Sequence, residues 1–489
     1  MTASSSELDP LVHRVLLPGF VGTAPPEWVL RRAERGLGGV VLFSRNVVDS
    51  EQVSALTGAL RAARPELLVS VDEEGGDVTR LESRRGSTFA GAAVLGAADD
   101  IGLTRTTSAG IGALLAECGV DWTLAPDADV NSNPDNPVIG VRSFGADAGL
   151  VARHVSAAVR GLQDDAGILA CAKHFPGHGD TAVDSHVGLP VVGALADELR
   201  ATHLAPFRAA IDAGVASIMT AHLRVTALDP ETPATLSAPI VTELLRGELG
   251  FDGLVVSDAL EMAGVAAYCG LEEGAVRALV AGVDALCLGG ELADESVVDR
   301  TAQRILEAVT TGRLPADRLA DAAARVDALV ARRATARPGL VDAGRAASAR
   351  AAATALRVTG DVGLDGAPSV ITLQPDAMVA VGAVPWGVAP LLAQAVPGTR
   401  AFQVGPDDDV DPAVGASTGT PLVVVARDPH RHAWQVAALD RILTARPDSV
   451  VVEMGLPSGL PLAARGRIDT LGASAVSAAA AARRLLEQT

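Results

Sequence analysis

The sequence predicts an α/β protein, in which a (β/α)8 TIM-type barrel is followed by a smaller α/β sandwich domain. From the N-terminus to about residue 335, short apolar runs alternate with helical patterns, as in βα units built around a parallel sheet. There are eight such runs, and the span that holds them has the size of a barrel of this type. A shorter alternation of the same kind follows in the rest of the 489-residue chain.

The eight apolar runs are the predicted barrel strands. Several are continuous stretches of Val, Ile and Leu, as expected of parallel strands that are buried on both faces. The runs are residues 15–20, 39–43, 67–72, 120–126, 168–175, 217–223, 254–258 and 285–289. The clearest helical patterns between them are residues 50–63, 146–164, 197–213 and 272–281. We therefore place the barrel at residues 1–335.

The remaining sequence predicts a linker and a second domain. Residues 336–350 are rich in Arg and Ala and include the pair Pro338–Gly339, which favours a helical linker. Apolar runs and helical patterns then predict a sandwich domain at residues 351–489, which is an ordinary domain size. The runs are residues 370–373, 378–381, 422–426 and 450–453, and the helical patterns are residues 433–444 and 473–488.

Composition excludes several classes of function. Asp and Glu total 59 against 40 Lys and Arg, so the formal net charge is −19, and such a chain repels nucleic acids and anionic membranes. The four cysteines are far apart and form no CxxC pair, which argues against a disulfide framework and a zinc finger and fits a reducing compartment. The first residues show no signal-peptide pattern, so we expect a cytoplasmic protein.

One long uncharged stretch lies between Asp376 and Arg400. A transmembrane helix needs about 20 consecutive apolar residues. Pro385, Pro390 and Pro397 interrupt this stretch, so we interpret it as a strand, a turn and a short helix.

Ionisable residues stand at the ends of the predicted strands. A single carboxylate in such a place is often the N-cap of the next helix. Together, however, these residues would form a ring at the carboxyl ends of the strands, where barrel enzymes have their active sites. The ring consists of Asp72, Glu73, Glu74, Asp127, Asp129, Lys173, His174, His222 and Asp258.

The densest cluster is the stretch KHFPGHGDTAVDSH at residues 173–186, which Pro176 and its glycines keep out of a helix. Two chemistries fit it. Its three histidines, with Asp180 or Asp184, have the ligand types of a metal site. Alternatively, Asp184 orients His186 as in a hydrolase dyad, because residues two apart in an extended chain point to the same side. The three histidines are His174, His178 and His186.

A second cluster, LVVSDALEM at residues 254–262, ends a predicted strand with Asp258. A carboxylate at that position faces the barrel mouth and can act as a nucleophile. The alternative interpretation is an N-cap of the following helix.

These two motifs, with VDEEGGDVTR at 71–80 and NPVIGVRSFG at 136–145, resemble glycoside hydrolase family 3. The similarity is greatest to its β-N-acetylhexosaminidase branch (the NagZ type) and covers the whole predicted barrel. The C-terminal part looks like the second domain of two-domain members. The resemblance implies no cofactor and no metal.

The resemblance also implies a role for each matching residue. Asp258 would be the catalytic nucleophile, and His186, supported by Asp184, the general acid and base. The side chains that would bind the hydroxyls of the sugar in the −1 subsite are Asp72, Arg80, Arg142, Lys173 and His174. Two positions depart from the family: Ala259 replaces a frequent second Asp, and Asp77 stands where a basic residue is frequent.

We therefore expect a retaining exo-β-N-acetylglucosaminidase that acts on glycosides such as cell-wall fragments through a covalent glycosyl-Asp intermediate. Four alternatives stay open from the sequence. Phosphate could replace water as acceptor, or Glu453 from the second domain could replace His186 as acid and base. The third is a metal-dependent hydrolase on the same barrel, and the fourth a non-catalytic sugar-binding protein.

Overall fold

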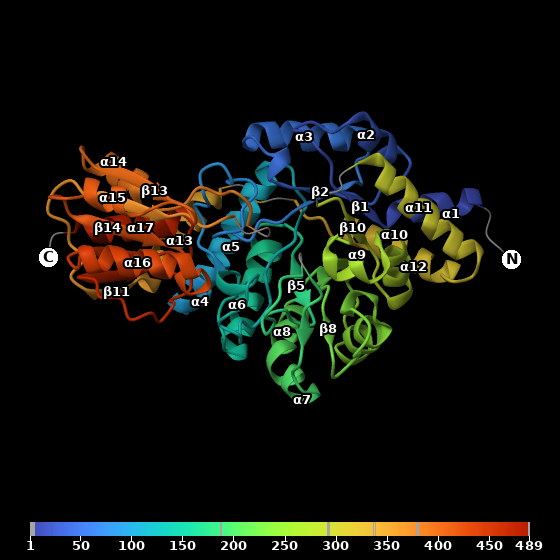
Figure 1. Ribbon diagram of the computed structural model, residues 1–489. Coiled ribbons are helices and arrows are strands. Elements are labelled where there is room, and N and C mark those ends of the chain that lie inside the picture. The colour runs from blue at the N-terminus through green and yellow to red at the C-terminus, as the bar shows by residue number, and fades with distance from the viewer. Residues whose placement is uncertain are drawn as a thin grey trace.

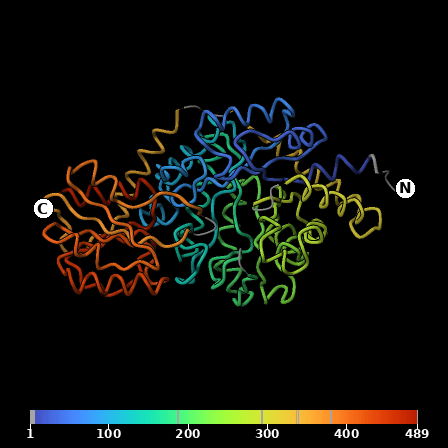
Figure 2. The backbone as a smooth tube through the Cα atoms, turned by 45° about the horizontal axis from the view of Figure 1, so that its top comes forward, coloured from blue at the N-terminus to red at the C-terminus, as the bar shows by residue number. Residues whose placement is uncertain are grey.

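The computed structural model describes residues 5–185, 188–290, 294–335, 337, 339–377 and 381–487. It confirms the α/β class: parallel strands alternate with helices in both parts of the chain. Figures 1 and 2 show the C-terminal part as a separate body at one end of the molecule.

Eight of the described strands fall inside the eight predicted apolar runs. Parallel pairing joins β2 to β3 to β4, β5 to β7 to β9, and β10 to β1. Isolated parallel bridges join the segment of β4 to that of β5, and β9 to the residue before β10. Apart from β10 and β1, strands that are neighbours in space are therefore also consecutive among these eight in the sequence. The strands are β1 (Leu16–Pro18), β2 (Gly39–Leu42), β3 (Leu68–Val71), β4 (Trp122–Thr123), β5 (Cys171–Phe175), β7 (Ser217–Thr220), β9 (Leu254–Ser257) and β10 (Leu286–Leu288).

Helices follow these strands and lie outside them (Figure 1). The longer ones are α2 (Glu27–Glu34), α3 (Ser50–Ala63), α5 (Ile101–Glu117), α6 (Ala148–Arg160), α8 (Ala205–Asp212), α10 (Leu271–Ala281), α11 (Glu295–Thr310) and α12 (Ala316–Ala331). Helix α3 has the bounds that the sequence predicts. It begins where the Asp49 carboxylate accepts a hydrogen bond from Gln52 N at 2.8 Å, which satisfies a free amide of the first turn.

Most of the stretch predicted as a linker is helical. Helix α13 (Val341–Ala355) packs along α5 and α4 (Ala92–Ala98) of the first part. The helices approach closely at a pair of glycines, because a Cβ on Gly344 would lie only 2.6 Å from Gly110 Cα. Thr107 and Ser348 share a buried hydrogen bond at the same contact. Residues 336 and 338 lie outside the described ranges.

The C-terminal part is a six-stranded sheet between two layers of helices. Its order is β11-β16-β15-β14-β12-β13, and β11 is antiparallel to β16 whereas the other pairs are parallel. The strands are β11 (Arg357–Gly360), β12 (Ser369–Leu373), β13 (Arg400–Val404), β14 (Leu422–Ala426), β15 (Val450–Glu453) and β16 (Gly466–Asp469). Alternating residues of β14 belong to two separate buried clusters, one with α17 (Ala475–Leu486) and one with α16 (Ala433–Ala445).

The uncharged stretch after Asp376 includes the short helix α14 (Ala389–Ala395), and its residues 378–380 lie outside the described ranges. Nowhere in the described ranges is a helix long and apolar enough to span a membrane.

Candidate active site

A cavity of about 350 Å³ opens at the carboxyl ends of the eight strands that fall in the predicted apolar runs. That volume is within the range of about 300–1,000 Å³ that is typical of small-molecule sites. The cavity is lined by six of the predicted site residues, Asp72, Arg80, Arg142, Lys173, His174 and Asp258. The structure thus brings together residues that lie up to 186 positions apart in the sequence.

Strand ends place the charged groups of this cavity. Lys173 and His174 belong to β5, and Asp258 directly follows β9. Asp258 N donates a hydrogen bond to Thr220 O at 3.3 Å, which ties the end of β9 to the end of β7. The Asp258 carboxylate accepts a hydrogen bond from Ala259 N at 2.8 Å and faces the cavity.

Glu74 is the centre of an ion-pair network in the cavity wall. Arg142 donates to both of its carboxylate oxygens, at 2.8 and 3.0 Å, and Lys173 Nζ lies 2.8 Å from the same carboxylate. Lys173 also donates to Asp72 Oδ1 at 2.6 Å. Burial raises the pKa of Glu74, but Arg142 and Lys173 outweigh it and hold that pKa well below its usual range. Burial lowers the pKa of Lys173, but Asp72 and Glu74 outweigh burial and raise that pKa. Glu74 and Lys173 therefore both stay charged.

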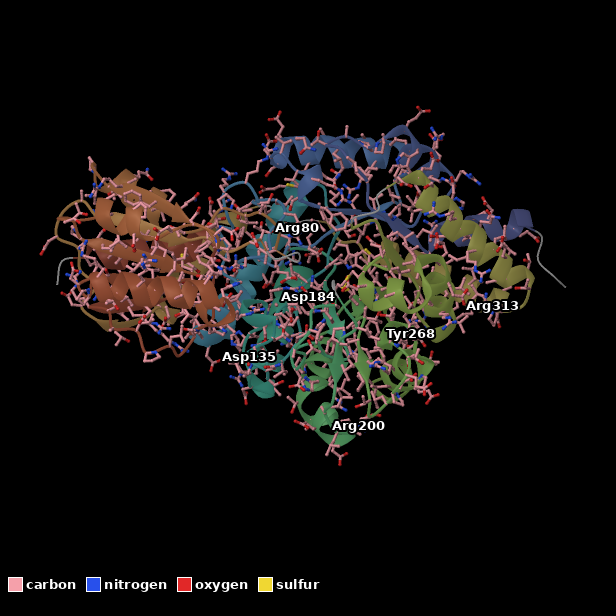
Figure 3. All side chains as sticks on the ribbon, in the orientation of Figure 1. Arg80, Asp135, Asp184, Arg200, Tyr268 and Arg313 are labelled. Carbon is pink, nitrogen blue, oxygen red and sulfur yellow. The ribbon has the colours of Figure 1, made fainter. Side chains whose placement is uncertain are left out.

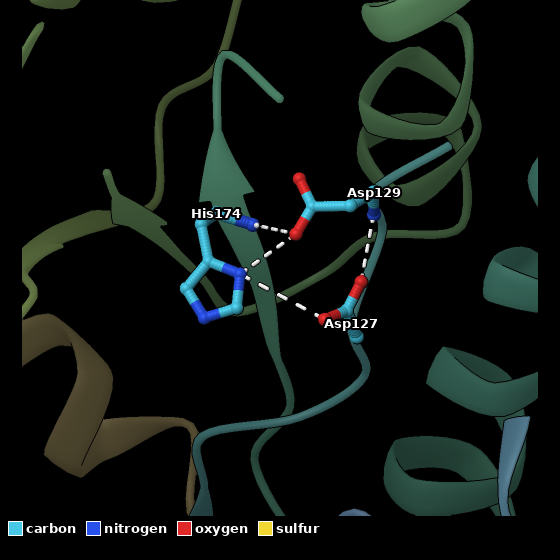
Figure 4. Close-up of side chains that lie close together, drawn as sticks. All are labelled: Asp127, Asp129 and His174. Atoms are coloured by element: carbon cyan, nitrogen blue, oxygen red, sulfur yellow. Dashed lines mark hydrogen bonds and ion pairs between the residues drawn. The ribbon is translucent and has the colours of Figure 1, made fainter. Parts of the chain in front are cut away.

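His174 is oriented by Asp129 (Figure 4). Its Nδ1 lies 2.7 Å from Asp129 Oδ2, and Arg142 Nη2 donates toward its Nε2 at 3.3 Å. Because a guanidinium can only donate, Nε2 is the acceptor and the proton belongs on Nδ1. Asp129 also accepts hydrogen bonds from the backbone N–H groups of His174 and His178, at 3.3 and 2.6 Å, so one carboxylate holds the whole turn after β5.

Asp127 and Asp129 differ in their charge. Burial and the neighbouring Asp129 raise the pKa of Asp127 well above its usual value. Burial also acts on Asp129, but His174 outweighs it and lowers the pKa of that carboxyl. Among the described atoms, Asp127 Oδ2 has no hydrogen-bond partner; Arg142 Nη2 is 3.8 Å away.

Metal binding was one alternative from the sequence. In the described ranges, Asp127, Asp129 and His174 bring possible ligand atoms within 4.8 Å of one another. The predicted histidine set includes His186, which lies outside these ranges. His178 instead bonds Thr181 Oγ1 at 2.7 Å and Ser185 Oγ at 3.1 Å, and burial lowers its pKa to about 4. Because the Arg142 guanidinium lies beside Asp127 and Nδ1 of His174 carries a proton, this cluster is poorly suited to a cation.

The predicted acid–base dyad is only partly visible. His186 lies outside the described residues, so its pairing with Asp184 stays a prediction. Asp184 lies on the loop after β5, and its carbonyl accepts from Gly188 N at 3.1 Å. The intervening Ser185 is buried and lines the cavity, so this loop reaches the site. Figure 3 labels Asp184 and Arg80 in the central part of the molecule.

Arg80 connects the cavity to the C-terminal part of the chain. Its side chain is 8% exposed, and its Nη1 donates to Val381 O at 3.0 Å. The backbone N–H groups of Arg80 and Leu81 donate to Glu73 Oε2 at 2.8 and 2.9 Å. Burial raises the pKa of Glu73 to about 7. The neighbour of Val381, Gly382, also lines the cavity.

Four carboxylates near this site belong to the predicted ring at the strand ends, but the sequence predicts no individual role for them. They are Glu73, Glu74, Asp127 and Asp129. Glu453, the alternative acid and base, is not among the residues that line the cavity. Its carboxylate accepts from Ser458 N and Oγ and from Arg467, and burial raises its pKa to about 7.

Comparisons with known proteins agree with this geometry. Residues 26–329 match the family described as "Glycosyl hydrolase family 3 N terminal domain". The chain is 37% identical over 329 residues to the "Beta-hexosaminidase A" of Pseudoalteromonas piscicida, an alignment that covers 62% of this chain but only 55% of that protein. It is 42% identical over 260 residues to a "Beta-hexosaminidase" of Alkalilimnicola ehrlichii, covering 52% of this chain and 73% of that one.

The whole chain also matches a solved structure. A glycoside hydrolase family 3 β-N-acetylglucosaminidase from Paenibacillus sp. str. FPU-7 superposes with a TM-score of 0.88 at 32% identity, over 98% of this chain and 96% of that chain. A β-glucoside phosphorylase superposes with a TM-score of 0.79 at 19% identity, which shows a shared fold. The family match covers more than half of the sequence and includes the strands that bear Asp72, Lys173 and Asp258, so the chain belongs to glycosyl hydrolase family 3.

Proposed function

We propose that this protein is a retaining exo-β-N-acetylglucosaminidase. The observation that carries the proposal is the shared cavity, in which the Asp258 carboxylate faces a fully charged network of Lys173, Arg142, Asp72 and Glu74. The names of the aligned hexosaminidases and of the Paenibacillus structure support this sugar specificity.

The scaffold that we propose is a closed (β/α)8 barrel with a sandwich domain attached. Two observations support it: β10 pairs with β1, and one buried cluster takes side chains from all eight strands. These side chains include Leu17, Val41, Leu68, Trp122, Cys171, Met219, Val256 and Cys287. Helix α13 then belongs to the junction between the two domains.

In the proposed complex, the network holds the hydroxyls of one terminal sugar. Its charged groups keep one another in place, so they lose little freedom when the sugar binds. Arg142 is already bidentate to Glu74, which makes it a structural cation as well as a possible donor. The residues proposed to contact the sugar are Asp72, Arg80, Arg142, Lys173 and His174.

The proposed reaction has two steps. Asp258 attacks the anomeric carbon and forms a covalent glycosyl-enzyme, while His186 protonates the leaving oxygen. His186, oriented by Asp184, then removes a proton from the water that releases the sugar. Histidine suits both tasks because it titrates near neutrality. Cytoplasmic cell-wall fragments remain the substrates predicted from the sequence.

The test is release of 4-nitrophenol from 4-nitrophenyl N-acetyl-β-glucosaminide in the presence of EDTA. We expect turnover by the wild type, loss of at least about 10³-fold in kcat for Asp258→Asn, and labelling of Asp258 by a fluorosugar substrate. Turnover that appears only after zinc is added would refute the metal-free mechanism. A rate that depends on phosphate would identify phosphate as the acceptor.

A further inference from the structure

The second domain reaches the substrate cavity at Arg80. The guanidinium of this proposed sugar ligand donates to the carbonyl of Val381, and the adjacent Gly382 lines the cavity. A guanidinium is a rigid planar fork, so a hydrogen bond at one nitrogen fixes the direction of the others. The position of Val381 therefore influences the orientation of the Arg80 guanidinium.

Asp77 anchors the second domain close to this contact. Its Oδ2 accepts from Arg427 Nη2 at 2.7 Å, and its Oδ1 accepts from Ala473 N at 2.7 Å. Arg427 directly follows β14, and Ala473 lies in the loop after β16, so both come from the carboxyl edge of the second sheet. Asp77 is only 6% exposed, which makes this a buried ion pair between the domains.

A tight turn at Gly75 and Gly76 leads into the segment that carries Asp77 and Arg80. Gly75 and Gly76 have φ angles of +77° and +63°, and a Cβ on Gly76 would lie 2.4 Å from Gly91 Cα, so other residues do not fit there. At the other end, Glu73 holds the backbone N–H of Arg80. The turn thus directs Asp77 into the domain interface and Arg80 into the cavity.

This contact also accounts for the departure from the family at position 77. A basic residue at that place would bring a like charge against the guanidinium of Arg427 and leave Ala473 N without its carboxylate acceptor. The acidic residue at position 77 and the arginine after β14 are thus complementary.

We propose that Asp77 is a positioning residue through which the second domain completes the sugar subsite. By docking Arg427 and Ala473, it keeps the Val381 carbonyl on Arg80, so sugar binding depends on the docking of the two domains. The inference rests on the proposed function in one respect, namely that Arg80 is a ligand of the sugar.

The experiment compares KM and kcat for 4-nitrophenyl N-acetyl-β-glucosaminide among full-length variants. Asp77→Asn and Arg427→Gln are expected to raise KM about tenfold and to change kcat less than about threefold, because they misplace a binding group and leave Asp258 in place. Arg427→Lys, which keeps the charge, should recover most of the affinity. The double variant should be no worse than Asp77→Asn, because the two residues act through one contact.

Arg446→Met is the matched control. Arg446 is similarly buried, at 17% side-chain exposure against 11% for Arg427, and bonds Asp448 and the Ser417 and Thr420 carbonyls within the same domain. It precedes β15 at the opposite edge of the sheet, so its loss should lower stability and leave KM unchanged.

Two results would overturn the inference: a wild-type KM in Asp77→Asn and Arg427→Gln, or an equal rise of KM in Arg446→Met. Turnover by the wild type is tested separately, and its absence would refute the proposed function. If the wild type is active but Asp77→Asn and Arg427→Gln have its KM, only the docking role is refuted.

Discussion

Asp127 and Asp129 are two residues apart, yet their surroundings give them opposite states. His174 lowers the pKa of Asp129, which accepts hydrogen bonds from His174 and His178, whereas burial and the neighbouring Asp129 raise the pKa of Asp127. The neutral form of Asp127, which this shift favours, resembles an asparagine in shape and charge. The same substitution by asparagine at Asp127 is therefore a control for the loss of negative charge at Asp129.

We expect Asp129→Asn to lower kcat/KM by about 10²-fold, because it releases the His174 ring and the turn after β5. Asp127→Asn should remain within about threefold of the wild type, since asparagine has the size and charge of the form that the raised pKa of Asp127 favours. Steady-state kinetics on the same substrate would test both. Equal losses in the two variants would contradict the assigned charge states.

Glu73 predicts a pH dependence of stability. Burial raises its pKa from 4.5 to about 7 in the folded protein. A raised pKa means that its contribution is fully present below pH 4.5 and is lost as the pH rises to about 7, a change of about 3 kcal/mol by linkage. Other buried carboxyls with raised pKa values, such as Glu453, remain in Glu73→Gln, so urea unfolding across this window should show a steeper loss of stability in the wild type than in the variant. A parallel slope in both proteins would assign it to other groups.

Residue-level prediction succeeded where a polar side chain ends a strand. The sequence placed Asp72, Lys173, His174 and Asp258 at such ends, and the structure brings all four to one cavity. The roles of Glu74 and Asp129 could not be predicted, because they depend on which strand ends become neighbours in space. For the same reason, the partner of Asp77 became apparent only in the structure.

At the scale of elements, burial decided which strands were predictable. Strands β14 and β15 are buried throughout and have the predicted bounds, whereas β11 is exposed along its whole length and β13 for most of it. Such edge strands carry too few apolar residues to give a pattern. The stretch predicted as a helical linker is helical over most of its length, but its packing against α5 could not be predicted, because sequence periodicity does not show which helix becomes a neighbour.

The contact between α13 and α5 makes a sharp prediction. A Cβ at position 344 would lie 2.6 Å from Gly110 Cα and 3.1 Å from Phe89 Cε1, so there is no room for a larger side chain. We expect Gly344→Val to lower the free energy of unfolding by about 2–3 kcal/mol through overpacking. Ala346→Val, at an exposed position of the same helix, should cost only about 0.5 kcal/mol of helix propensity. Similar urea midpoints for the two variants would contradict the close approach.

At the scale of the whole molecule, the two proposed domains are in contact at several places. Helix α13 packs against both α5 and α17, Val476 N donates to Ser87 O at 3.3 Å, and the Asp77–Arg427 pair is buried between them. Removing one partner of such a pair costs about 3–5 kcal/mol when the other charge stays buried, so this contact favours the docked arrangement.

Unfolding of the wild type should therefore be one cooperative event, although chains with two domains often unfold in two steps. Calorimetry is expected to show a single transition for the wild type. Asp77→Asn should split or broaden it, because the second domain then loses its main charged anchor on the first. Arg446→Met should lower the midpoint and keep one transition, because it weakens the second domain at the edge opposite the interface. Two well-separated transitions in the wild type would show that the domains unfold independently, and the interface would then not couple them.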